Sequence, residues 1–170
     1  MTSHVHLVAV PREEGSLTLA LRAAHSRYSQ WVNAREGWSG HLWQGRFFSC
    51  PLDEAHLWAA VRYVEQNPVR AGIVGVAEEY EWSSAAAHCG LRADPLVSGE
   101  LLDGVAPGVW QAHLAEPVTA ADTERLRSRT RSGLPCGDEG FLSRVSKLVG
   151  RALVVRGRPR KPEEGDESAD

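Results

Sequence analysis

His4-Val5-His6-Leu7-Val8-Ala9-Val10 is the stretch of sequence that decides the expected fold. It is apolar and β-branched up to Pro11, and this pattern predicts a strand that the proline ends. Alternate residues of a strand point to the same face. His4 and His6 are therefore expected on one side, with Val5 turned into the core between them.

Two imidazoles on one face of a strand form a two-ligand platform for a metal ion. A His-x-His triplet is also common in half-exposed strands that hold no metal. The metal interpretation therefore depends on support from the rest of the chain.

The segment after this strand predicts a helix that packs on a sheet. Ser16 is a suitable N-cap, apolar residues recur at helical spacing, and Gly37 ends the pattern. Residues 42–48 are expected to form a loop that runs into a strand.

A second helix is predicted over residues 54–67, with Asp53 as its N-cap. Pro68 should stop this helix, because the residue before a proline is disfavoured in helical geometry. Residues 69–82 predict a turn and a short extended piece, and residues 83–90 a short Ala-rich helix.

Beyond Pro95 the composition changes to a Gly- and Pro-containing linker and three further helices. These are predicted over Val109–Ala115, Ala120–Arg131 and Asp138–Val149. Residues 156–170 have almost no apolar content and are expected to be disordered. The predicted organisation is a core over 1–94, a small helical C-terminal module over 95–155 and a tail over 156–170.

Composition limits the possible classes of protein. The chain has 170 residues, is 42% hydrophobic and carries a net charge of -3, which suits one modest core and argues against a uniformly basic coat. Cys50, Cys89 and Cys136 are widely spaced and form no CxxC pair, as expected for reduced thiols in a cytoplasmic protein. No apolar run approaches the 18 residues of a membrane span. We therefore expect a soluble protein with no membrane contact.

Tyr63 and Asn67 are four residues apart on the second predicted helix, so both side chains should emerge from one face. If this face packs over His4 and His6, three neutral ligands surround a divalent cation and the phenol lies beside it. A tyrosine that attacks a phosphodiester forms a covalent phosphotyrosine intermediate. Chemistry of that kind cuts and rejoins nucleic acid.

Activation of the phenol is the main difficulty, because a pKa near 10 corresponds to a handicap of roughly 4 kcal/mol at neutral pH. A nearby cation must supply part of this. Arg62 and Arg70 are close to Tyr63 in sequence. The ordinary alternative is that Tyr63 is a half-buried surface aromatic and Asn67 a helix-terminal residue.

Four motifs together resemble the REP-associated tyrosine transposases, within the IS200-like single-tyrosine transposase superfamily. They are Met-Thr-Ser-His-Val-His-Leu (1–7), Gly-His-Leu-Trp-Gln-Gly-Arg-Phe (40–47), Arg-Tyr-Val-Glu-Gln-Asn-Pro-Val-Arg-Ala-Gly-Ile-Val (62–74) and Tyr-Glu-Trp-Ser-Ser (80–84). Segments 110–114, 126–137 and 156–161 are similar to the tail of longer members. The resemblance thus extends over nearly the whole chain.

The resemblance implies an HUH endonuclease, in which a His-hydrophobic-His pair binds Mg²⁺ or Mn²⁺. It assigns His4, His6 and Asn67 as metal ligands and Tyr63 as the nucleophile that leaves a 5′-phosphotyrosine and a free 3′-hydroxyl. The implied substrate is single-stranded or hairpin DNA of repetitive extragenic palindromes. The implied fold is α+β, an antiparallel sheet flanked by helices in a ferredoxin-like or RNA-recognition-like core, with a small helical C-terminal extension.

The resemblance also implies 40 to 60 further residues before the His-x-His strand. We expect that the sheet lacks its first strand and helix and that in-frame coding sequence lies upstream of Met1. An exposed sheet edge would otherwise pair with another chain, so a monomer and a homodimer both remain open.

Several residues are candidates for DNA contacts. Trp43, Gln44 and Arg46 combine a stacking surface, an amide and a guanidinium, although Trp43 is equally suited to a core. Arg156, Arg158 and Arg160 resemble an AT-hook, or serve as a solvated basic tail. Arg62 and Arg70 complete the predicted set. The arginines at 125, 127, 129 and 131 occupy more than one helix face and are expected to form an electrostatic surface.

Three functions follow from this sequence. The first is a metal-dependent single-strand DNA endonuclease and strand-transferase. The second is a catalytically inactive DNA hairpin-binding remnant. The third is a metal-dependent hydrolase that uses water, for which only Glu13 and Glu14 are close to the histidines in sequence.

Overall fold

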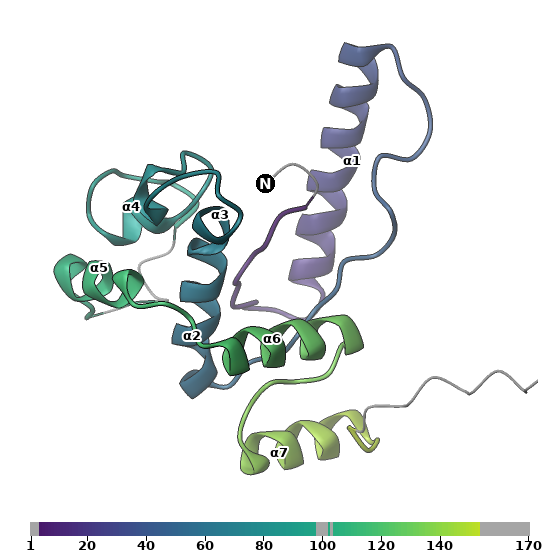
Figure 1. The fold of residues 1–170 in the computed structure, drawn as a ribbon. Coiled ribbons are helices and arrows are strands. Elements are labelled where there is room, and N and C mark those ends of the chain that lie inside the picture. The colour runs from purple at the N-terminus through teal and green to yellow at the C-terminus, as the bar shows by residue number, and fades with distance from the viewer. Residues whose placement is uncertain (1–3, 98–101, 103, 154–170) are drawn as a thin grey trace, which may run out of the picture.

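The computed structural model describes residues 4–97, 102 and 104–153, which form a helical protein (Figure 1). The elements are α1 (Ser16–Glu36), α2 (Glu54–Glu65), α3 (Asn67–Arg70), the 3₁₀ helix η1 (Ala77–Glu79), α4 (Ala85–His88), α5 (Pro107–Ala115), α6 (Ala120–Ser132) and α7 (Glu139–Val149). Across these described residues, the only β pairing is an isolated parallel bridge between Leu52 and Cys136.

The predicted α+β fold with an antiparallel sheet is therefore wrong. Residues 4–10 and 42–48 have no regular secondary structure, and η1 replaces the extended piece predicted within 69–82. A strand is stable only where a neighbour takes up its backbone hydrogen bonds, and no described segment pairs with residues 4–10 in this way.

Exposed and half-buried side chains alternate over residues 5–8, but in the opposite sense to the prediction. Val5 and Leu7 are 68% and 65% exposed. Val8 packs against the core, and His6 is half-buried. His6 is thus turned toward the protein and Val5 to solvent, while His4 is exposed at the start of the described segment.

α1 begins and ends close to the predicted positions. Gly37 caps its C-terminus at φ 68°, a left-handed conformation that glycine adopts without strain, and its N–H bonds to the carbonyl of Asn33. The N-cap is Gly15 instead of the predicted Ser16. Without a sheet to cover this helix, its aromatic side is at the surface, and Tyr28 and Trp31 are 50% and 53% exposed.

α2 is the helix on which the site depends. Asp53 accepts a hydrogen bond from the backbone N–H of His56 at 2.8 Å, the predicted N-cap, which stabilises a helix by about 1 kcal/mol. The helix ends at Glu65, two residues earlier than predicted. Pro68 does not stop helical structure, because it occupies the first turn of α3, where its missing N–H has no intrahelical partner to lose.

Two buried clusters lie against α2. One joins Val61 to Ala77, Ala85, Cys89, Trp110 and Leu114, from η1, α4 and α5. The other joins Ala60 and Tyr63 to Leu126 of α6 and to Cys136. α2 therefore packs against η1, α4 and α5 through one cluster and against α6 through the other.

The three C-terminal helices agree with the prediction within two residues at each end. Thr119 and Asp138 cap α6 and α7 through side-chain hydrogen bonds to backbone N–H groups. The tail predicted over 156–170 lies outside the described residues. None of the described helices combines the length and apolar character that a membrane span requires.

Candidate active site around Tyr63

The N-terminal segment brings the predicted histidines to Tyr63. The ring centroids of His4 and His6 are 4.9 Å apart, and those of His6 and Tyr63 are 5.9 Å apart, both in edge-on contact. Tyr63 is 9% exposed and belongs to the buried stripe of α2. His6 and Tyr63, nearly sixty positions apart in sequence, are thus in contact, and His4 lies next to them through its contact with His6.

His6 has the properties of an available neutral ligand. Its Nε2 atom is buried and has no hydrogen-bond partner. Burial, followed by the charges of His4 and Arg70, lowers the pKa of His6 below its ordinary value. The ring is therefore mainly neutral at pH 7, which is the form that coordinates metals.

Two arginines contact Tyr63 from opposite parts of the chain. Arg127 of α6 donates its Nε–H to the Tyr63 hydroxyl at 3.2 Å. The guanidinium carbon of Arg70 lies 4.3 Å from the centre of the Tyr63 ring, a cation-π contact. Arg70 also donates to the backbone carbonyl of Tyr63 at 2.9 Å, so its position over the ring is held from two sides.

The surroundings of Tyr63 shift the pKa of both arginines. The hydrogen bond to Tyr63 raises the pKa of Arg127. Burial lowers the pKa of Arg70, which the nearby charge of Arg127 lowers further. Both groups stay protonated at neutral pH, because guanidinium does not lose its proton in proteins. The phenol is therefore in contact with two positively charged groups.

Arg127 is a site residue that sequence reasoning misses. The row of arginines in residues 125–131 is evident in the sequence, but nothing in its spacing distinguishes the one that reaches Tyr63. Arg62, in contrast, turns away from the phenol. It forms an ion pair with Glu116 at 3.3 Å and donates to the backbone carbonyl of His113.

The remaining predicted residues are more dispersed. Asn67 is half-buried at the start of α3, one turn after Tyr63, and its backbone carbonyl accepts from Ala71. Trp43 stacks on the ring of His25 at 4.0 Å and donates to the His25 carbonyl, so it packs on α1. Gln44 and Arg46 are exposed. Arg156, Arg158 and Arg160 lie outside the described residues.

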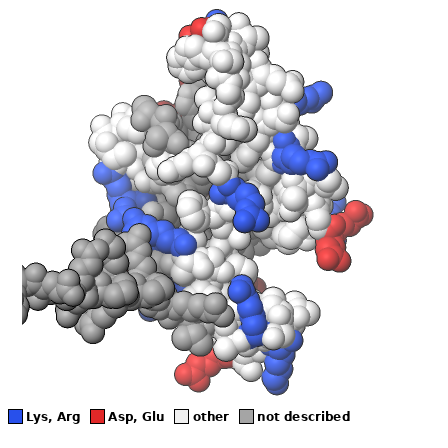
Figure 2. Space-filling view, turned by 90° about the vertical axis from the view of Figure 1, so that its right-hand side faces the viewer, with Lys and Arg blue, Asp and Glu red and all other residues white. Residues whose placement is uncertain are grey.

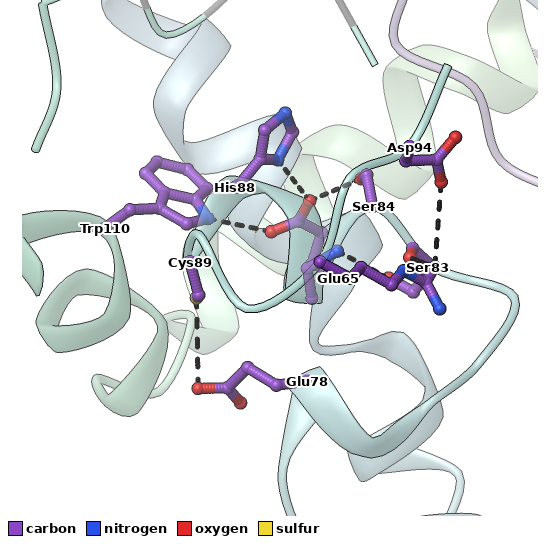
Figure 3. Close-up of polar contacts among 10 residues, drawn as sticks. Glu65, Glu78, Ser83, Ser84, His88, Cys89, Asp94 and Trp110 are labelled. Carbon is purple, nitrogen blue, oxygen red and sulfur yellow. Dashed lines mark hydrogen bonds and ion pairs between the residues drawn. The ribbon is translucent and has the colours of Figure 1, made fainter. Parts of the chain in front are cut away.

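A buried carboxyl group, two residues after Tyr63, fixes the end of α2 (Figure 3). Glu65 is 0% exposed and accepts hydrogen bonds from Ser84 Oγ at 2.5 Å and Trp110 Nε1 at 2.9 Å. The same Glu65 oxygen that accepts from Ser84, Oε1, also lies 2.6 Å from Nδ1 of His88. The network ties α2 to α4 and α5, and so limits how far the helix that carries Tyr63 can move.

The geometry fits a metal site only in part. Over the described ranges, no group of three or more His, Cys, Asp or Glu side chains is placed to hold an ion. Two imidazoles and one amide are nevertheless a usable donor set for a cation that takes its other ligands from water and phosphate oxygens. The unpartnered Nε2 of His6 is the observation that favours such a ligand.

Comparison with known proteins finds a similarity to IS200-like transposases over the N-terminal part of the chain. No curated protein and no solved structure matches the chain. Residues 1–67 match the family model described as "Transposase IS200 like", and this segment includes His4, His6, Tyr63 and Asn67. This N-terminal segment, less than half of the chain, is therefore similar to IS200-like transposases.

Proposed function

We propose that this protein is a single-strand DNA endonuclease and strand-transferase of the REP-associated type, with Tyr63 as the nucleophile. The observation that carries the proposal is the contact of His6 with both His4 and Tyr63, whose hydroxyl receives a hydrogen bond from Arg127. The match of residues 1–67 to IS200-like transposases supports the same chemistry.

The proposed reaction exchanges one phosphate ester for another. The Tyr63 oxygen attacks the phosphorus of a phosphodiester and forms a P–O bond, and the bond from phosphorus to the 3′-oxygen breaks. The phenol proton passes to water, and the departing 3′-oxygen takes a proton from water to become a hydroxyl. The 5′-phosphate stays on Tyr63, and a later attack by a 3′-hydroxyl rejoins the strand.

His4, His6 and Asn67 are the proposed ligands of Mg²⁺ or Mn²⁺. A divalent cation at this position supplies polarisation of the phosphodiester. The protein's own residues do the rest: the α2 scaffold holds the phenol, and Arg70 and Arg127 stabilise negative charge on the attacking oxygen and on the phosphate.

The proposed substrate is a DNA hairpin with adjacent unpaired bases, bound by a monomer or a homodimer in the cytoplasm. Figure 2 supports a polyanionic partner, since Lys and Arg side chains are spread over the face shown and acidic side chains lie at its margins. The proposed DNA contacts are Trp43, Gln44, Arg46 and Arg62, together with the arginines of the tail. Trp43 is partly buried where it stacks on His25, so only part of its ring is available to stack on a DNA base.

The test incubates the protein with a labelled hairpin oligonucleotide that carries a single-stranded linker on either side, in Mn²⁺. We expect a covalent protein-DNA adduct that survives denaturing electrophoresis and is absent from Tyr63→Phe. Tyr28→Phe is the matched control, because Tyr28 is half exposed on α1, and it should retain the adduct. An adduct that persists in Tyr63→Phe would contradict the assignment.

A catalytically inactive hairpin-binding protein is the second candidate. The lack of a third His, Cys, Asp or Glu beside His4 and His6 in the described part of the chain favours it. Hairpin binding without any adduct in Mg²⁺ or Mn²⁺ would support this candidate over the first.

A further inference from the structure

We propose that Arg127 is a catalytic residue of the Tyr63 site: it holds the attacking oxygen and, together with Arg70, binds the phosphodiester that this oxygen attacks. The inference rests on the proposed function, which it deepens by assigning a residue from α6. Arg127 lies outside residues 1–67, the segment that matches the IS200-like family model. The C-terminal helices would then be part of the active site.

The contact between Arg127 and Tyr63 is supported by the packing of α6 against α2. Leu126, the neighbour of Arg127 on α6, is 7% exposed and lies in one buried cluster with Tyr63, Ala60 and Cys136. Leu134, close to the end of α6, is also 7% exposed. Arg127 therefore projects from a docked helix: the residue is exposed at the surface, and its Nε–H reaches the Tyr63 hydroxyl.

The charge balance at this point indicates an anionic ligand. The guanidinium groups of Arg70 and Arg127 lie near the same phenol, and each affects the other through its charge. Neither forms an ion pair with a carboxylate of the described residues, although the charge of Glu124 on α6 contributes to the raised pKa of Arg127. Two like charges held together are unfavourable unless an anion lies between them. A phosphate group satisfies this need and matches the donor geometry of arginine.

The hydrogen bond also orients the nucleophile. Arg127 donates to one lone pair of the Tyr63 oxygen, which fixes the hydroxyl group while its second lone pair stays available for attack on phosphorus. Because arginine cannot accept a proton, it does not act as the base. Its positive charge opposes the negative charge that develops as the phenol proton leaves and the P–O bond forms.

The first experiment compares single-turnover adduct formation at saturating hairpin DNA in wild-type protein, Arg127→Gln, Arg127→Lys and Arg131→Gln. Arg131 is the matched control, because it lies one helical turn further along α6 and no hydrogen bond joins it to Tyr63. Both glutamine variants remove one positive charge, so the general attraction to DNA falls to a similar extent.

We expect Arg127→Gln to slow adduct formation by about 10²-fold at saturation, the scale for loss of one preorganised donor. Arg131→Gln should change this rate less than about twofold and affect only DNA affinity. Arg127→Lys restores the charge and should recover part of the rate. Thermal melting of each variant checks that it is folded. Equal rates in wild type, Arg127→Gln and Arg131→Gln would overturn the inference and leave the proposed function intact.

The second experiment does not require activity. The Nε–H signals of the arginines are recorded by ¹⁵N NMR, and that of Arg127 is assigned from Arg127→Lys. We expect this signal to shift in Tyr63→Phe, and to shift in wild type on addition of oligothymidine, by more than the Arg131 signal. If the wild type forms no adduct but these shifts occur, the proposed reaction fails and the anion site stands. If neither the Tyr63→Phe substitution nor the addition of oligothymidine shifts the Arg127 signal more than the Arg131 signal, the inference is refuted.

Discussion

Replacement of Trp110 by phenylalanine tests how strongly the buried network holds the helix that carries Tyr63. Trp110 and Glu65 are both 0% exposed, and the indole N–H donates to Glu65 Oε2 at 2.9 Å (Figure 3). Phenylalanine keeps an aromatic ring but has no donor. Because the site is closed to water, no solvent molecule is expected to replace the lost hydrogen bond.

The expected loss has two parts. An acceptor left unsatisfied in the interior costs about 1–3 kcal/mol. The smaller ring leaves a cavity beside Trp58 and His113, whose rings lie 5.5 Å and 4.9 Å from that of Trp110, and this costs about 1 kcal/mol. Trp110→Phe should therefore lower the free energy of unfolding by about 2–4 kcal/mol.

The assay is urea unfolding followed by far-ultraviolet circular dichroism. Trp82→Phe is the matched control, because Trp82 is 80% exposed and its replacement should change stability by less than about 0.5 kcal/mol. In a double-mutant cycle, Glu65→Gln and Trp110→Phe should couple by about 1 kcal/mol or more. Two results would refute this prediction: a loss of unfolding free energy in Trp110→Phe no larger than in Trp82→Phe, or additive losses for Glu65→Gln and Trp110→Phe.

Three further predictions concern other parts of the structure. Burial lowers the pKa of His113 below its ordinary value, so its stabilising contribution is present above about pH 6.5 and is lost as pH falls through the folded-state pKa. His113→Gln should flatten part of the decline in Tm below that pH, and superimposable profiles would contradict this. Burial raises the pKa of Cys50 and of Cys89 to about 11, so iodoacetamide at pH 8 should label the folded protein far more slowly than protein in urea; equal labelling rates would count against it. Leu126→Ala should lower the free energy of unfolding by about 2–4 kcal/mol, whereas Leu148→Ala, at an 85% exposed position, should cost less than about 0.5 kcal/mol, and a similar cost for both in urea unfolding would show that α6 is not docked.

The helices could be predicted from the sequence because their signals are local. Asp53 and Gly37 mark helix ends through hydrogen bonds to residues three or four positions away. The expected strand at residues 4–10 failed for the opposite reason. A strand depends on a partner elsewhere in the chain, and the described residues supply none, so the alternation of His6 and Val5 set only which side faces the protein.

In the candidate site, too, the residues marked by local sequence signals could be predicted, and the residue placed by tertiary packing could not. His4, His6 and Tyr63 could be found because a short spacing rule marks the histidines and a motif marks the tyrosine, and the structure brings them together. Arg127 could not, because its role depends on how α6 docks on α2 through Leu126. Four arginines at alternate positions are equivalent in sequence, and only tertiary packing selects one of them.

The most direct test of the account is to locate the DNA attachment by mass spectrometry. Trypsin cleavage after Arg62 and Arg70 releases residues 63–70, in which Tyr63 is the only tyrosine. After reaction with a hairpin oligonucleotide in Mn²⁺ and nuclease digestion, we predict a nucleotide remnant joined through phosphate to Tyr63. A remnant on Tyr28 or Tyr80, or a peptide 63–70 that stays unmodified while the DNA is cleaved, would contradict the account.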